Sequence, residues 1–256
     1  MFGADEIEQL YETISKTVAL GQALMLRATF RPYSTKRGQE YALHGFSRRL
    51  GTLGHCLEGV FDAIPPERNR LPTKGEVRDA EAFLHSFIVN CFGAFDNLAH
   101  IWVAERGVQK KSGKPLGRQQ IGLTAKCEDV RASLPPTVRE KLVSFADWFR
   151  YLEDYRDALA HRIPVYIADR AYRPEDLEII KKIRAQKEVA FEEREFSRVH
   201  ELMDKEDKIG CFNPLMMHSY NENAAQMYFH SQLLCDHYTV IEFGDLIFDA
   251  LDNQKP

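Results

Sequence analysis

The sequence predicts a mainly α-helical protein, an antiparallel helical bundle with a small C-terminal α+β appendage made of a β-hairpin and helices. Apolar residues recur at helical spacing over most of residues 5–162. Residues 82–104 are apolar nearly all round, which is typical of the central helix of a bundle. Beyond Pro164 the pattern changes to a short apolar run, a charged helix and two hairpin-like segments, so the appendage begins there.

Prolines bound the first helices of the predicted bundle. Residues 5–30 form an amphipathic helix that ends before Pro32, because proline cannot continue a helix. A second helical stretch covers about residues 38–63, and its glycines predict either a break or close packing. The central helix follows from about residue 76 to residue 105.

A basic loop over residues 107–120 leads towards the next long helix, predicted for residues 137–162. The spacing of Thr137 and Glu140 matches a capping box at its start. Its end is fixed by Pro164, since the residue before a proline is pushed towards extended geometry.

The appendage is predicted to hold five short elements. A strand is expected at residues 165–167, a charged helix at 174–208, hairpin strands at 215–220 and 226–234, and a last helix at 236–251. We therefore expect two parts, which are a bundle over residues 1–163 and a C-terminal extension over residues 164–256 that packs on it.

Composition narrows the classes of function. The formal net charge of −4 gives no global attraction for nucleic acid, so an RNA contact would need a local basic patch. The five cysteines include no CxxC pair, which argues against a disulfide framework or a structural zinc site. The acidic N-terminal segment does not resemble a signal peptide, and we expect no apolar run long enough to span a membrane. These features favour a cytoplasmic protein.

Arg156 and His161 are the best candidates for chemistry. Arg156 falls inside the apolar stripe of the 137–162 helix, where a guanidinium needs an anionic partner or a ligand. His161 lies about 140° further round a regular helix of 100° per residue. The two side chains would converge only if the helix unwinds before Pro164 or if two subunits assemble the site. A histidine at a helix end can act as a general acid near neutral pH.

A row of polar residues crosses the apolar central helix. We expect Asp96 or Asn97 to pair with Arg156 if this row faces the 137–162 helix. An equally good interpretation is a buried hydrogen-bonded network that fixes the register of the helices. The row consists of Ser86, Asn90, Gly93, Asn97 and His100, with Asp96 beside it.

The segment Tyr155–His161 resembles the signature of the HEPN superfamily, which is an arginine, a polar residue, a short spacer and a histidine late in a helical bundle. The resemblance implies a bundle that dimerises through this motif and acts as an endoribonuclease without metal or cofactor, often as a toxin or antiphage effector. It implies that Arg156 binds the scissile phosphate, that Asp157 orients it, and that His161 moves protons during attack by the 2′-hydroxyl. The implied partners are a second copy, RNA and an antitoxin or defence-system protein.

The loose spacing of arginine and histidine recurs in the chain, for example at Arg49 and His55. Arg156 and His161 alone combine a four-residue spacer with a helix-ending proline, and the resemblance covers about residues 75–165. The alternative is a catalytically inactive HEPN-like module that binds RNA, a nucleotide or a protein partner. In that case Arg156 belongs to a structural ion pair.

Two further sets of residues are weaker candidates. His218 and His230 are predicted on paired strands; they could border the Arg156 cleft or pack locally, and a third metal ligand is not evident. A basic loop could contact RNA phosphates, although a solvated connector is the simpler interpretation. This loop carries Lys110, Lys111, Lys114 and Arg118.

Overall fold

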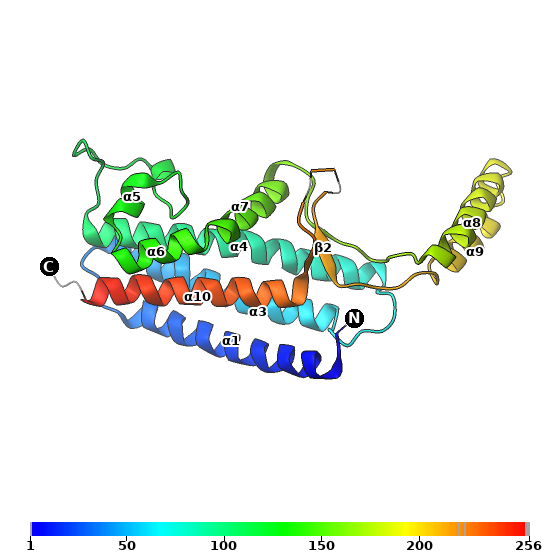
Figure 1. The fold of residues 1–256 in the computed structure, drawn as a ribbon, viewed down its shortest axis with the longest axis horizontal. Coiled ribbons are helices and arrows are strands. Elements are labelled where there is room, and N and C mark those ends of the chain that lie inside the picture. The colour runs from blue at the N-terminus through cyan, green and yellow to red at the C-terminus, as the bar shows by residue number, and fades with distance from the viewer. Residues whose placement is uncertain (1, 220, 223, 254–256) are drawn as a thin grey trace.

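The computed structural model describes residues 2–219, 221–222 and 224–253 and confirms a mainly α-helical protein with a C-terminal α+β portion. Four long helices lie side by side and form the bundle (Figure 1). They are α1 (Ala4–Phe30), α3 (Ser47–Ala63), α4 (Lys74–Arg106) and α10 (Phe229–Asn253).

The helix directions are mixed. Helix α3 runs opposite to α1 and α4, whereas α10 runs in the same direction as α1 (Figure 1). Arg27, near the end of α1, accordingly pairs with three aspartates near the end of α10. Helix α10 therefore lies in the bundle and packs on α1, α3 and α4, although the sequence grouped it with the C-terminal extension.

The central helix α4 begins at a capping box, in which the Glu76 amide donates to Thr73 Oγ1 and the Thr73 amide donates to Glu76 Oε2. It ends at Gly107, which takes the left-handed conformation with φ of 60°. By length and hydropathy α4 could cross a membrane, contrary to our expectation of no such run. However, 61% of its apolar window is buried inside the protein, as expected for a central bundle helix.

The second helical stretch is continuous but changes its pitch. Helix α2 (Lys36–Glu40) leads into the π-helical turn η1 (Tyr41–Phe46) and then into α3. Wide turns of this kind often occur at functional sites. This turn brings the backbone of Gly45 against the side chain of Asn97 on α4, where a Cβ atom would lie only 2.9 Å from Asn97.

The helix predicted for residues 137–162 is broken in two. Helix α6 (Pro136–Ser144) begins with proline at its first turn instead of the predicted capping box. The chain turns at Phe145, whose ring packs on Phe243, and continues as α7 (Ala146–His161). The short helices η2 (Arg118–Gln120) and α5 (Glu128–Ser133) precede α6.

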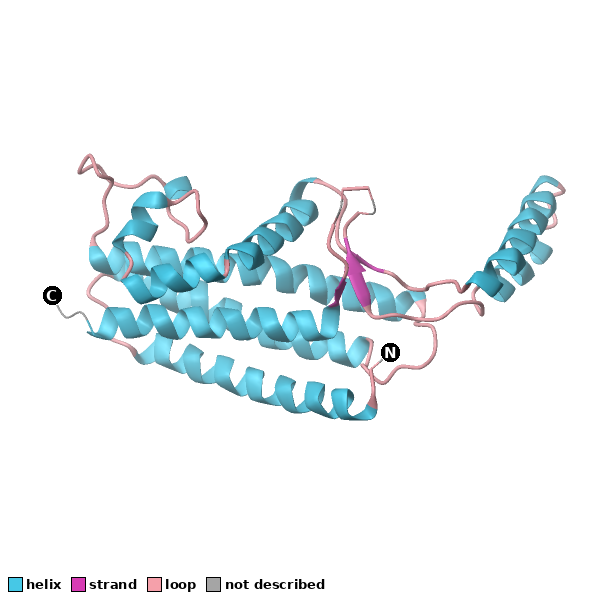
Figure 2. Ribbon diagram, viewed as in Figure 1, coloured by secondary structure: helices cyan, strands magenta, loops and turns pink. Residues whose placement is uncertain are grey.

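The predicted hairpin is present but shorter. Strands β1 (Tyr166–Ile167), β2 (Leu215–Met217) and β3 (Met227–Tyr228) form an antiparallel sheet in that order (Figure 2). The segment predicted as the second hairpin strand enters α10 at Phe229, so the last helix begins seven residues earlier than expected. Tyr220 and Asn223, in the predicted hairpin, lie outside the described residues.

The charged helix predicted for residues 174–208 is a helical hairpin that projects from the bundle (Figures 1 and 2). Helices α8 (Pro174–Glu192) and α9 (Phe196–Glu206) meet at a turn in which Arg194 has a φ of 61°. Their small core, separate from that of the bundle, is completed by the ion pairs of Glu206 with Arg184 and Lys187.

Candidate functional site

Arg156 lines an open cleft of about 560 Å³ between α3, α4, α7 and the loop after η2. Five elements that are far apart in the sequence contribute its polar side chains: η1, α3, α4, η2 and α7. These side chains include Tyr41, Arg49, Asp96, His100, Arg118 and Arg156.

The Arg156 side chain is half-buried at the wall of this cleft. Its guanidinium lies 4.2 Å from the centre of the Phe92 ring and pairs with Asp157 at 3.0 Å. The side chain is 31% exposed, so the apolar stripe of α7 does not enclose it as we expected. Its Nε is buried and has no hydrogen-bond partner. A buried donor without a partner is energetically costly. The N–H groups of the exposed part of the guanidinium are the ones that an acceptor in the cleft can meet.

Asp96 faces the same cleft, and its charge is affected by two arginines. Burial raises the pKa of Asp96 to about 6, although the Arg156 and Arg49 guanidinium groups oppose the rise. The carboxyl therefore gains protons close to neutral pH. Asp96 was expected to pair with Arg156. The Arg156 charge does act on the Asp96 carboxyl, but no ion pair joins these two described residues.

The polar row on α4 is partnered mainly by Arg49, which the sequence analysis did not select. Arg49 Nε donates to Asn97 Oδ1 at 3.0 Å, and its Nη1 donates to Asn90 Oδ1 at 2.9 Å. The prediction that Asn97 pairs with Arg156 is therefore wrong. Gly93 was the available signal, because a glycine within a row of polar residues leaves room for a large side chain from the neighbouring helix.

Aromatic rings close one side of the cleft. The Tyr41 and His100 rings are stacked, with centroids 4.2 Å apart and an interplanar angle of 4°. The Arg37 guanidinium covers the Tyr41 ring at 4.5 Å. Burial, together with the positive charges of Arg37 and Arg118, lowers the pKa of His100 to about 4. His100 is therefore neutral at pH 7 and offers a hydrogen bond rather than a charge.

His161 does not line this cleft. It is the last residue of α7 and is exposed, and the helix is unbroken from Ala146 to this residue. The helix therefore does not unwind before Pro164 in a way that would bring His161 to Arg156. The two side chains stay about 140° apart around the helix axis. Within one chain, the two residues of the motif point to different surroundings.

The histidines of the predicted hairpin lie elsewhere. His218 is buried and its Nε2 lies 2.8 Å from Asp154 Oδ2, on a carboxyl that also pairs with Arg162. His230 stands in the first turn of α10, its Nε2 lies 2.6 Å from the carbonyl oxygen of Ile64, and burial lowers its pKa to about 4. Neither histidine lines the Arg156 cleft. Among the described residues, no group of three potential ligands could hold a metal ion.

The basic loop is divided between two places. Arg118 lines the cleft, whereas the three lysines belong to a turn beyond it. In that turn the Lys110 amide donates to the Lys114 carbonyl at 2.9 Å, and Gly113 has a φ of 74°. Lys111 and Lys114 are exposed, so they could meet RNA only outside the cleft.

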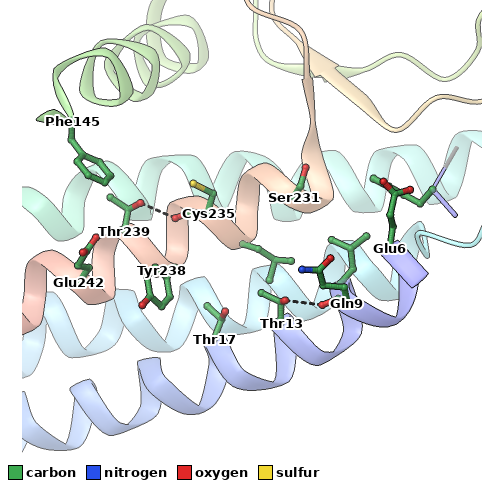
Figure 3. A pocket seen from close by; sticks show the side chains of 13 residues that line it. Glu6, Gln9, Thr13, Thr17, Phe145, Ser231, Cys235, Tyr238, Thr239 and Glu242 are labelled. Carbon is green, nitrogen blue, oxygen red and sulfur yellow. Dashed lines mark hydrogen bonds between the residues drawn. The ribbon is translucent and has the colours of Figure 1, made fainter. Parts of the chain in front are cut away.

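A second hollow, of about 590 Å³, lies between α1, α10 and Phe145 (Figure 3). Sequence reasoning did not predict it. The hydroxyl groups of Thr13 and Thr239 donate to the carbonyls of Gln9 and Cys235 in their own helices. We call this hollow the α1/α10 groove; its walls are more apolar than those of the cleft.

Comparison with family models, with curated proteins and with solved structures finds no match to this chain. The resemblance to the HEPN superfamily therefore rests on Tyr155–His161 and on the position of this segment at the end of a bundle helix.

Proposed function

We propose that this protein is a HEPN-like, metal-independent endoribonuclease that acts as a homodimer. One observation carries the proposal: Arg156, in an arginine–histidine motif at a helix end, lines an open cleft instead of being sealed in the core. A partly exposed guanidinium at the wall of a cleft is suited to bind a phosphate oxygen.

The charges of the cleft support an anionic ligand despite the net negative charge of the protein. Arg49, Arg118 and Arg156 line it together with two carboxylates. One of these, Glu153, is paired with Lys126 at 2.6 Å, and the other, Asp96, has its pKa raised to about 6. The local balance is therefore positive, and this local charge is what attracts RNA phosphates.

The proposed reaction is attack of an RNA 2′-hydroxyl on the adjacent phosphorus. The bond from phosphorus to the 5′-oxygen of the next nucleotide breaks, which leaves a 2′,3′-cyclic phosphate and a 5′-hydroxyl. Arg156 would stabilise the charge on the phosphate oxygens, and Asp157, paired with it, would orient the guanidinium. His161 would accept the 2′-hydroxyl proton and then donate a proton to the leaving 5′-oxygen.

The orientation of His161 supports a site shared by two chains. It projects from the end of α7 about 140° away from Arg156, so one chain alone does not bring them together. If two copies meet at the ends of their α7 helices, Arg156 of one copy can approach His161 of the other. A toxin or antiphage role, a cytoplasmic location and an antitoxin or defence-system partner belong to the same proposal through the family resemblance.

The test compares wild type with Arg156→Ala and His161→Ala in cells and with purified RNA. Arg150→Ala is the matched control, because Arg150 lies on the same helix but is exposed and, among the described residues, pairs only with Asp147. We expect growth arrest and RNA with cyclic phosphate ends from wild type and from the control, and intact RNA from the other two. Intact RNA in all four, in cells and with the purified proteins, would contradict the proposal.

The inactive HEPN-like module is a second candidate, favoured by the ion pair between Arg156 and Asp157. It predicts that the purified protein binds RNA, a nucleotide or a protein partner and leaves RNA intact. Binding of a labelled oligoribonucleotide without any cleavage would select this candidate.

A further inference from the structure

We propose that Arg49 is a second phosphate-binding residue of the Arg156 cleft and that it holds the RNA strand from the α3 wall. The inference rests on RNA as the ligand of the proposed function, but it does not depend on cleavage.

Arg49 is held by neutral groups. Its Nε and Nη1 donate to the amide oxygens of Asn97 and Asn90, and Asn90 is itself fixed by its bond to the Ser86 carbonyl at 2.8 Å. Amide oxygens orient the guanidinium without neutralising it. Within the described part of the chain Arg49 forms no ion pair, and a guanidinium has five N–H donors, so three remain for a ligand.

Two glycines make the space for this arrangement. A Cβ atom at Gly93 would lie 2.4 Å from the Arg49 guanidinium carbon, so any larger residue would push the head group away. A Cβ atom at Gly45 would press on Asn97, which holds Arg49. A glycine within a helix costs about 1 kcal/mol relative to alanine. The central helix thus has a destabilising residue where the guanidinium lies.

Arg49 and Arg156 come from different helices and line one cleft. Both are close enough to Asp96 to lower its pKa against the effect of burial. A single strand of RNA carries one phosphate per nucleotide, and two guanidinium groups in one cleft can therefore hold it at two walls. The neighbouring Arg48 differs: it is exposed, its Nη2 lies 3.2 Å from His44 Nδ1, and it does not line the cleft.

A purely structural role for Arg49 would be to join α3 to α4. Such a role predicts an effect on thermal stability and none on how RNA binding depends on salt. Phosphate binding predicts that the slope of log affinity against log salt decreases when the charge is removed. The slope therefore distinguishes a phosphate contact from a structural one.

The experiment measures fluorescence anisotropy of a labelled single-stranded oligoribonucleotide with the full-length His161→Ala protein, which does not cleave it under the proposal. Arg49→Gln is compared with the matched control Arg48→Gln over a range of salt concentrations. We expect Arg49→Gln to weaken binding about tenfold and to reduce the salt slope by about one. Arg48→Gln should change affinity by less than about twofold. A folded Arg49→Gln protein with unchanged affinity and slope would overturn the inference.

Gly93→Ala is a second variant that keeps the charge of Arg49 and displaces its head group. We expect it to weaken RNA binding severalfold, and unchanged binding would also contradict the inference if Arg49→Gln does not fold. Failure of the two proposals is distinguishable. Arg49-dependent binding with no cleavage by wild type would defeat the endoribonuclease alone, whereas cleavage with affinity indifferent to Arg49 would defeat this inference alone.

Discussion

The Arg156 cleft and the α1/α10 groove are nearly equal in volume, about 560 and 590 Å³, and differ in chemistry. The cleft holds arginines whose N–H groups are only partly used, whereas the Thr13 and Thr239 hydroxyls of the groove are bonded to their own helices (Figure 3). The volume of a hollow alone therefore does not identify a ligand-binding site. The free N–H groups of the cleft arginines can bind an anionic ligand, whereas the two threonine hydroxyls already have their hydrogen bonds.

The largest expected difference between the two hollows is in RNA cleavage. Arg156→Ala should lower the rate about 1000-fold, because it removes the positive charge from the phosphate oxygens in the transition state. Tyr238→Ala, in the groove, should change the rate less than about twofold, since Tyr238 is exposed on α10 and does not line the Arg156 cleft. Rates on a labelled oligoribonucleotide measure both effects, and similar losses in the two variants would remove the distinction.

Acidity should affect the cleft through Asp96. Its folded-state pKa of about 6 is raised above its usual value, so the carboxyl is charged above pH 6 and gains a proton below it. A bound phosphate favours the protonated form further, and RNA affinity should therefore increase as pH falls from 7.5 to 5.5, by about fivefold. His100 should not contribute, because its pKa is lowered to about 4.

The Asp96 effect is measured by anisotropy in the His161→Ala protein, which lacks the His161 imidazole. Asp96→Asn should bind RNA more tightly at pH 7.5 and show a nearly flat profile. A steep profile in Asp96→Asn would assign the pH dependence to another group.

A substitution at Tyr155 should lower the stability of the protein without changing its affinity for RNA. The Tyr155 hydroxyl donates to the Ala225 carbonyl and lies 3.4 Å from the Met216 carbonyl oxygen, so it links α7 to the segment that carries β2 and β3. Tyr155→Phe should lower the free energy of unfolding by about 1 kcal/mol and leave RNA affinity unchanged. Chemical denaturation and anisotropy test the two halves of this prediction, and a loss of affinity in the folded variant would show that the hairpin supports the cleft.

The smallest effect is expected in the groove. Thr13→Val removes a hydroxyl that bonds only to the Gln9 carbonyl of its own helix, and the variant should change stability by less than about 0.5 kcal/mol. RNA binding should be unchanged. A clear change in RNA affinity would show that the groove, too, belongs to the RNA-binding surface.

The sequence predicted the helical class well because helical periodicity is a local property of the chain. The breaks at Phe145 and Arg194 were missed, since each depends on packing or ion pairs made across the fold. The hairpin was predicted from residues 215–220 and 226–234, but the second segment continues into α10, where tertiary packing imposes a helix on Phe229 and His230.

Only some residues of the cleft could be predicted from the sequence. Arg156 could be found by its place in an apolar stripe, and the polar row on α4 by its spacing. Arg49 was not selected, because its partners Asn90 and Asn97 lie more than forty residues away along the chain, and Gly93 was the only local sign of it. The separation of Arg156 from His161 was predictable from helix geometry alone and holds in the folded chain.

The most direct test of the central claim is to combine two inactive proteins. Arg156→Ala and His161→Ala chains with different tags are co-expressed, the mixed dimer is purified, and its rate of RNA cleavage is compared with those of the three homodimers. A site that takes Arg156 from one chain and His161 from the other leaves one intact site in the mixed dimer, so about half the wild-type rate should return. A mixed dimer as inactive as its parents, beside an active wild type, would contradict the shared site.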